Sequence, residues 1–225
     1  MKRIFLPVLF TVLLSAFFSC SVLRGYTLNE QDAAAAIRQL LQIGTREGNL
    51  TGAFNKEMIR ATVFPESLRK ALNTLDQLGL TSEVDRFTTT MSVAAEQTAT
   101  KSVPIFVSGI SNMRLTDAMR IVKSGGTAAT DYLRASVGDS LRRSITPVMQ
   151  SALDEYKLNE QWKKLMTPIQ SLVGNKLNLD LSNLMAGAVS EVMFQKIAEK
   201  ELEIRRRASA RTTPLLQRVF SRNWE

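Results

Sequence analysis

The chain has 225 residues, of which 44% are hydrophobic and 22% are charged, the balance of an ordinary globular protein. It contains no histidine, which excludes Ser-His-Asp and Cys-His catalytic arrangements and histidine-based metal sites. Its one cysteine cannot form an intrachain disulfide, and its net charge of +8 favours anionic partners. Carboxylate chemistry remains open on composition alone.

The first twenty residues, MKRIFLPVLFTVLLSAFFSC, have the pattern of a secretory signal peptide. Lys2 and Arg3 form a positive start, and an uncharged apolar run follows from residue 4 to residue 18. This run is shorter than the roughly 20 residues that a membrane-spanning helix needs. We therefore predict a lipoprotein-type signal peptide over residues 1–19.

Cys20 ends the apolar run, and the segment FFSC resembles the lipobox of bacterial lipoproteins, whose cysteine becomes the acylated first residue of the mature chain. Ser19 is the small residue expected before the cut, whereas Phe17 and Phe18 depart from the usual pattern. We predict lipid attachment at Cys20. Because no aspartate follows directly, the resemblance implies the periplasmic face of the outer membrane. An ordinary cut after Ser21, which would release a soluble periplasmic or secreted protein, is the alternative.

Removal of residues 1–19 leaves 27 basic and 21 acidic residues, so the mature chain has a net charge of +6. Such a chain is attracted to anionic surfaces, and we expect contact with anionic lipid or lipopolysaccharide. An envelope address also predicts an envelope protein as partner and argues against nucleic acid. We expect no metal and no cofactor.

Helical patterns begin after a tether over residues 20–28. Asn29 is the expected cap of the first helix, and Gly44 and Gly48 are expected to end it. Residues 58–64 are rich in β-branched side chains and precede a proline, which predicts a short extended piece.

Capping residues, proline and glycine predict the next helix boundaries. Ser82 and Asp85 have the spacing of a capping box. Pro104 is expected to interrupt the helix that starts there, and Gly125 and Gly126 are expected to end the following one.

Further helices are predicted after residue 138, among them a short one over residues 159–166. One starts at Asp139 and contains Pro147, which is expected to kink it or to lie near a helix start. A long periodic segment covers residues 184–207, and Thr213 with Pro214 starts a final short helix.

The apolar faces of these helices must pack against one another, and no repeat or low-complexity tract divides the chain. The sequence therefore predicts an all-α fold over residues 29–225: a single domain of about eight to ten short and medium helices in an irregular bundle.

The segment SGGTAATDYLR, residues 124–134, is the main candidate for a polar site. Its glycines follow a helix, and Lys123 precedes them, so the order of a P-loop is absent. We expect a helix end at the glycines and a Thr127 cap on the next helix, whose N-terminus can accept an anion. The alternative is that these side chains only fix the helix against its neighbours. The candidate site residues are Thr127, Thr130, Asp131 and Arg134, with Arg211 as a candidate neighbour.

The basic run RRRASAR, residues 205–211, has two interpretations. It is either a contact for acidic lipid or a solvated helix end, where arginines complement the helix dipole. Glu201 with Arg205 and Glu203 with Arg207 are i,i+4 pairs in the favourable order, which favours the helix end.

Four segments together resemble a bacterial family known as domain of unknown function 4197: PIFVSGISNM, GGTAATDYLR, FQKIAEKELEIR and ARTTPLLQRVF. The resemblance extends from about Leu68 to Phe220. It implies an exported envelope protein, often a lipoprotein, and no activity. The matching residues are Gly125, Gly126, Thr127, Ala128, Ala129, Thr130, Asp131, Tyr132, Arg211, Thr212, Thr213, Leu215 and Leu216.

Three functions remain open. The first is a non-catalytic, membrane-tethered lipoprotein that binds a partner or ligand. The second is an envelope enzyme that uses carboxylates, which predicts a pocket with two close Asp or Glu side chains. The third is a helical carrier of a small apolar molecule, which predicts an apolar cavity of roughly 300 Å³ or more.

Overall fold

The computed structural model describes residues 26–169 and 180–224, and within these ranges every regular element is helical. The predicted signal peptide and Cys20 lie outside the described residues. The elements are α2 (Glu30–Glu47), α3 (Lys56–Met58), the π-helical η2 (Ile59–Val63), α4 (Glu66–Gln77), α5 (Thr81–Asn112), α6 (Ala118–Ser124), α7 (Ala128–Glu155), α8 (Leu158–Met166), the 3₁₀ turn η3 (Thr167–Ile169), α10 (Leu181–Arg206), the 3₁₀ turn η5 (Ala208–Ala210) and α11 (Pro214–Phe220).

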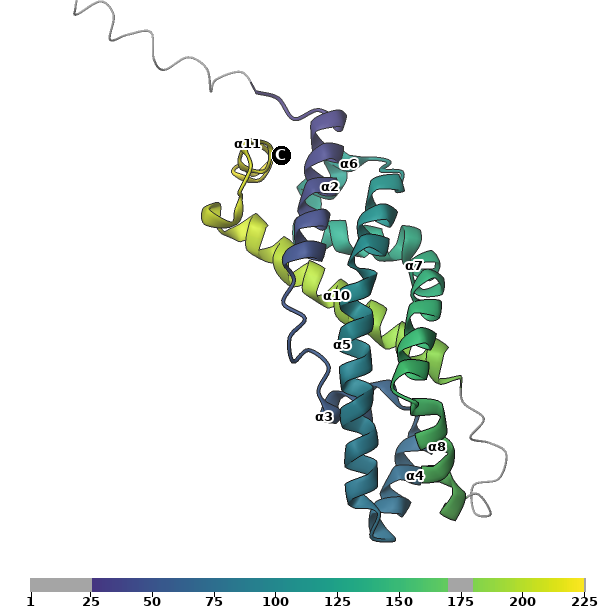
Figure 1. The fold of residues 1–225 in the computed structure, drawn as a ribbon. Coiled ribbons are helices and arrows are strands. Elements are labelled where there is room, and N and C mark those ends of the chain that lie inside the picture. The colour runs from purple at the N-terminus through teal and green to yellow at the C-terminus, as the bar shows by residue number, and fades with distance from the viewer. Residues whose placement is uncertain (1–25, 170–179, 225) are drawn as a thin grey trace, which may run out of the picture.

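The helices form an elongated bundle in which α10 packs along α7 and α2, and α5 packs along α7 (Figure 1). The helices α4 and α8 lie at one end of the bundle, and α6 and α11 lie at the other. The described chain enters at the α11 end, next to the start of α2.

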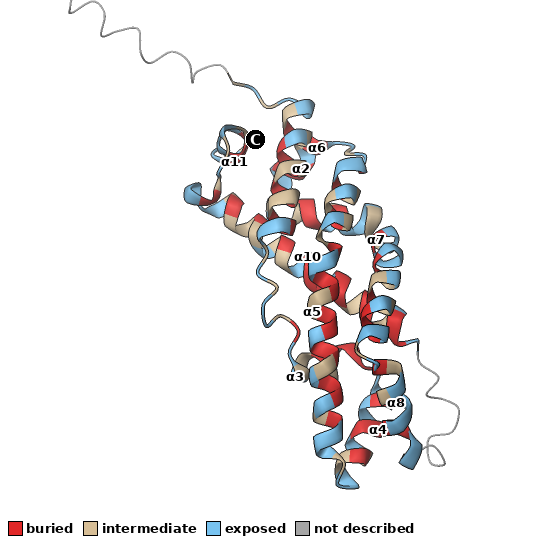
Figure 2. Cartoon of the chain, in the orientation of Figure 1, coloured by how far each residue is buried: buried red, intermediate tan, exposed pale blue. Residues whose placement is uncertain are grey.

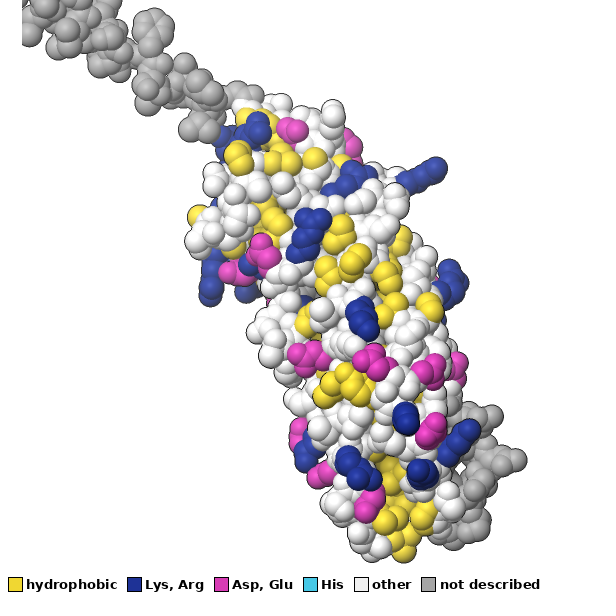
Figure 3. Space-filling view, in the orientation of Figure 1, with side chains coloured by type: hydrophobic (Ala, Val, Ile, Leu, Met, Phe, Trp, Pro, Cys, Tyr) yellow, Lys and Arg dark blue, Asp and Glu magenta, His cyan; other side chains and the backbone are white. Residues whose placement is uncertain are grey.

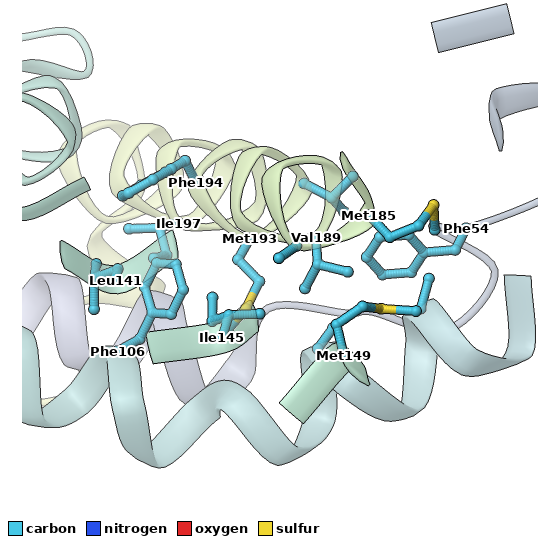
Figure 4. Packing of buried hydrophobic residues seen from close by; sticks show 14 of the residues in the cluster. Phe54, Phe106, Leu141, Ile145, Met149, Met185, Val189, Met193, Phe194 and Ile197 are labelled. Carbon is cyan, nitrogen blue, oxygen red and sulfur yellow. The ribbon is translucent and has the colours of Figure 1, made fainter. Parts of the chain in front are cut away.

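Buried side chains follow one face of each long helix, as the stripes in Figure 2 show. In the core between α5, α7 and α10, the rings of Phe106 and Phe194 pack edge to face, with their centroids 5.2 Å apart. Leu141 and Ile145 reach toward this pair from α7 (Figure 4). This continuous apolar core is the main source of stability, because each fully buried large side chain contributes about 1.5–3 kcal/mol.

The prediction of an all-α irregular bundle is confirmed, with nine α-helices in the described part of the chain. Asn29 caps α2 by accepting a hydrogen bond from Asp32 N–H at 2.8 Å. Thr213 likewise caps α11, and Gly125 and Gly126 end α6 with φ angles of +69° and +55°.

Two predicted helix boundaries are wrong, because α5 and α7 run on where breaks were expected. Pro104 lies inside α5, and α7, which begins at Ala128, runs without a break past Asp139, where a separate helix start was expected, and through Pro147. A proline inside a helix costs about 3 kcal/mol. Buried residues on both sides of each proline, such as Phe106 after Pro104, offset this cost by packing against neighbouring helices.

The predicted extended piece at residues 58–64 is also wrong. Asn55 caps a short helix by accepting a hydrogen bond from Met58 N–H at 2.8 Å, and the chain continues as the π-helical η2. Ile59 and Val63 are buried at helical spacing, so tertiary burial outweighs their β propensity. Only Phe64 has an extended backbone, directly before Pro65.

Ser82 and Asp85 do not form a capping box. The Ser82 hydroxyl donates to the neighbouring Glu83 carboxylate at 2.8 Å, and this hydrogen bond lowers the pKa of Glu83. Asp85 pairs instead with Lys56 at 3.1 Å, which ties α3 to α5.

Gly44 does not end α2, which continues to Glu47. It is buried where α2 meets α10: a Cβ placed on Gly44 would lie 3.2 Å from the backbone Cα of Ile197. The glycine therefore permits a close approach of two helices, whereas Gly48 is the actual end of α2.

Candidate functional site

The buried carboxylate of Glu201 lies at the N-terminus of α7. Glu201, on α10, has no exposed surface and accepts hydrogen bonds from the N–H groups of Ala129 and Thr130 at 3.0 and 2.8 Å. The Thr130 hydroxyl donates to the same carboxylate at 2.7 Å. The helix N-terminus that the sequence identified as an anion site thus binds an anion of the chain itself.

Arg205 joins the same carboxylate to the end of α6. Its Nε donates to Glu201 at 2.9 Å, and its two terminal nitrogens donate to the carbonyls of Val122 and Ile121 at 3.0 and 3.2 Å. The guanidinium also stacks on Phe220, 5.0 Å from the ring centroid. The Arg205 side chain therefore donates hydrogen bonds to two carbonyls near the end of α6 and to the buried carboxylate, and it also packs against α11.

The predicted cap on α7 is wrong, because the Thr127 hydroxyl does not cap the helix. It donates to Asp131 Oδ2 at 2.9 Å on the exposed surface. The N–H groups that a cap would satisfy are bonded to Glu201 instead.

The candidate site residues fall into separate places. Thr130 donates to the buried carboxylate of Glu201. The Asp131 side chain, in contrast, accepts a hydrogen bond from Thr127 alone among the described residues. Arg211 donates to the carbonyls of Ile204 and Arg205 and so closes the end of α10.

Arg134 points away from these residues into the space between α7 and α10. Its Nη2 lies 2.9 Å from Glu191 Oε1, and its guanidinium lies 5.2 Å from the centroid of the Phe194 ring. These side chains border a hollow of about 540 Å³ whose lining includes Asp139 and Arg142. Both carboxylates of this lining face arginines, at 2.9 and 3.6 Å. Its charged lining differs from the enclosed apolar cavity that a carrier needs.

The predicted ion pair of Glu201 with Arg205 forms. Glu203 does not pair with Arg207 as predicted but with Lys200, at 3.1 Å. Arg206 and Arg207 are exposed at the end of α10. The run 205–211 is therefore a helix end whose Arg205 is partly buried, as the dipole interpretation expects.

Glu201 was not predicted to be a buried group, although a pattern in the sequence indicates it. Glu201 lies four residues after Ile197 and three before Ile204, on the apolar stripe of α10. A carboxylate at a core position must find charged or hydrogen-bonding partners. The sequence between the two isoleucines therefore predicts a buried polar contact.

A second cluster forms where the described chain begins. Tyr26 packs edge to face on Trp224 with ring centroids 5.9 Å apart, and its hydroxyl donates to Asp32 at 2.7 Å. Arg218 lies over the Tyr26 ring at 5.5 Å, and Arg222 lies over the Trp224 ring at 6.0 Å. Burial, followed by the hydrogen bond to Asp32, raises the pKa of Tyr26 to about 12.

On the face seen in Figure 3, lysine and arginine side chains are spread over the length of the molecule, with acidic side chains between them. Within residues 26–169 and 180–224, no three Cys, Asp or Glu side chains are grouped to hold a metal ion. None of the helices in the same ranges is long and apolar enough to span a bilayer.

Comparison with curated proteins finds no match, and comparison with solved structures finds none either. A family model does match, over residues 27–221, and its description is "Protein of unknown function (DUF4197)". The match covers α2 through α11 and so includes the cluster around Glu201, whereas Tyr26, Arg222 and Trp224 of the second cluster lie just outside it. The chain therefore belongs to the DUF4197 family, as the four sequence segments indicated.

Proposed function

We propose that this protein is a lipoprotein of the cell envelope, anchored at Cys20 and facing the periplasm, whose helical domain binds a partner or ligand without catalysis. The single observation that supports this role is the cluster of Tyr26, Trp224, Arg218 and Arg222 at the point where the chain leaves toward Cys20. The cluster fixes the start of the domain against its own C-terminal end.

Chain length then determines which end of the domain lies near the bilayer. Five residues lie between Cys20 and Tyr26, and the six residue steps from one to the other span at most about 22 Å when fully extended. An acylated Cys20 would therefore hold Tyr26, and with it α11, within this distance of the membrane. Two or three acyl chains are sufficient for stable anchoring, at about 0.8 kcal/mol per buried CH₂.

The chemistry of this end suits a bilayer surface. Tyr26 and Trp224 are of the residue types that favour the interface between lipid and water. Arg218 and Arg222 lie on their rings, and a basic residue near an acidic membrane contributes about 1 kcal/mol to binding. Lys163 and Lys164, on α8, belong to the opposite end of the bundle (Figure 1).

Globomycin, which blocks the lipoprotein signal peptidase, tests the anchor in cells. We expect the treated cells to accumulate the uncut precursor, and the Cys20→Ala variant to lose its membrane fraction. A globomycin-insensitive chain of full length in the cytosol would overturn the proposal.

Vesicles that contain brominated phosphatidylglycerol test the orientation. With Trp162→Phe in place, the fluorescence of Trp224 should be quenched, and Arg218→Gln with Arg222→Gln should reduce the quenching at moderate salt. The matched control is Lys163→Gln with Lys164→Gln, which should leave it unchanged. Equal effects of the two double variants would contradict the proposed orientation.

A further inference from the structure

A hollow of about 540 Å³ lies between α7 and the first half of α10, and three arginines line it: Arg134, Arg142 and Arg143. Ligand pockets have volumes of about 300–1,000 Å³, so a small molecule fits here. Glu191 and Asp139 are the acidic side chains of the lining, which leaves one positive charge in excess.

Arg134 is held in place before any ligand arrives. Its contact with Glu191 at 2.9 Å and its stacking on Phe194 fix the plane of the guanidinium. A guanidinium has five N–H donors, and the contact with Glu191 uses one. The remaining donors are available at the edge of the hollow.

Arg142 and Arg143 keep their hydrogen-bonding capacity. The Nη2 atom of Arg142 lies 3.6 Å from Asp139 Oδ1, which is too long for a hydrogen bond, and the Asp139 side chain is 87% exposed. The side chain of Arg143 is exposed and forms no ion pair or hydrogen bond with another residue in the described ranges. Two neighbouring guanidiniums therefore lack a firm acidic partner.

Two glycines keep the hollow open between the arginines. A Cβ on Gly187 would lie 3.8 Å from Cδ of Arg142, and a Cβ on Gly138 would lie 3.7 Å from Cγ of Arg134. These are ordinary contact distances, so alanine fits at both positions. A larger side chain would extend into the space that the arginines surround.

We propose that this hollow binds the phosphate group of a small phosphorylated molecule, with Arg142 and Arg143 as its main ligands and Arg134 as a fixed third donor. Planar guanidiniums match the oxygens of a phosphate with paired hydrogen bonds, and three of them can serve its three terminal oxygens. The phosphate site goes beyond the proposed function and does not need the anchor; only the choice of a soluble ligand over a lipid headgroup rests on the proposed orientation.

The position of the hollow favours a soluble ligand over a lipid headgroup. Ser190 is part of the lining and lies 16 residues before the end of α10 at Arg206. At 1.5 Å per residue this places the hollow roughly 24 Å along α10 from the α11 end. A molecule free in the surrounding solution reaches this position, whereas a bilayer beside α11 does not.

Calorimetric titration of the detergent-solubilised full chain with pyrophosphate tests the site. We expect saturable binding that weakens about tenfold or more in Arg142→Gln with Arg143→Gln, because hydrogen bonds to charged groups are lost. The control is Arg206→Gln with Arg207→Gln, which removes the same charge at the end of α10 and should change affinity by less than about twofold. Absence of saturable binding, or equal weakening in both double variants, would overturn the site.

Two further experiments are needed. The first distinguishes loss of the site from loss of folding, and the second distinguishes a soluble ligand from a lipid headgroup. Gly187→Leu removes no charge, and it should abolish pyrophosphate binding while the far-ultraviolet circular dichroism stays unchanged; retained binding in this folded variant would contradict the site. Flotation with phosphatidylglycerol vesicles should be unaffected by Arg142→Gln with Arg143→Gln. Loss of flotation in this variant, together with no binding of pyrophosphate, would assign a lipid headgroup and overturn the soluble ligand. An unacylated Cys20 would sink the proposed anchor and leave the titration result intact.

Discussion

Glu201 and Thr130 share two hydrogen bonds across the interface of α10 and α7: one carboxylate oxygen accepts the backbone N–H at 2.8 Å and the side-chain hydroxyl at 2.7 Å. The carboxylate is inaccessible to solvent and also binds Arg205. Because Arg205 also donates to the carbonyls of Ile121 and Val122, the carboxylate connects α10 with α7 directly and with α6 through Arg205. The start of α7, which the sequence suggested as a ligand site, thus has a structural role through Thr130.

Replacement of Glu201 by Ala should destabilise the protein severely. The change leaves the partly buried Arg205 charge and the buried N-terminus of α7 without their partner, at an expected cost of about 3–5 kcal/mol in the free energy of unfolding. Urea denaturation measures this loss. Glu201→Gln keeps the shape and should cost less, so a Glu201→Ala variant as stable as the Gln variant would contradict the role of the charge.

Thr130 and Thr127 provide a matched pair at the same helix start. Thr130→Val removes a buried hydrogen bond to a carboxylate and should cost about 1.5–3 kcal/mol. Thr127→Val removes an exposed hydrogen bond to Asp131 and should change stability by less than about 0.5 kcal/mol. Comparable midpoints of urea denaturation for the two variants would refute this assignment.

Gly44 should tolerate no large side chain. Gly44→Leu would press on the backbone of Ile197, and overpacking of this kind costs about 1–3 kcal/mol. Gly187→Ala is the opposite control, because its Cβ meets only Arg142 at 3.8 Å and alanine gains up to about 1 kcal/mol in helix propensity. Thermal unfolding should therefore shift downward for the first variant and upward for the second; a downward shift in both would be inconsistent with the packing described.

The raised pKa of Tyr26 leads us to expect that the contacts around this residue are lost at alkaline pH. Burial and the Asp32 carboxylate raise the pKa of its phenol from 10.0 to about 12, so the neutral phenol favours the folded form. The stabilisation is complete below pH 10 and is lost as the pH rises toward 12. Absorbance at the tyrosinate band should show one late-titrating tyrosine that disappears in Tyr26→Phe, and an unchanged titration in this variant would contradict the contact.

Local sequence patterns predicted those features that depend on a few neighbouring residues. Asn29 and Thr213 are caps as expected, and the glycine pair at 125 and 126 ends α6 with positive φ. The patterns failed where contacts with residues far away in the sequence determine whether a helix continues. Pro104 was expected to interrupt its helix, but packing of Phe106 against α10 keeps α5 continuous, and no local pattern contains that information.

The candidate site shows the same division. The sequence located the N-terminus of α7 correctly and left open that this N-terminus accepts an anion. It did not identify Glu201 as that anion, because the partner lies 71 residues away along the chain. Arg134, grouped with Asp131 by spacing on one helix, points instead to Glu191 on α10. The hollow beside it depends on two helices that the sequence could not place side by side.

The mass of the N-terminal peptide, measured on protein isolated from its native membrane, tests the central claim most directly. We expect the mature chain to begin at Cys20 and to carry the mass of two or three acyl chains on this residue. A chain that begins at Met1, or an unmodified Cys20 within an uncut N-terminus, would contradict the anchored orientation on which the proposed function depends.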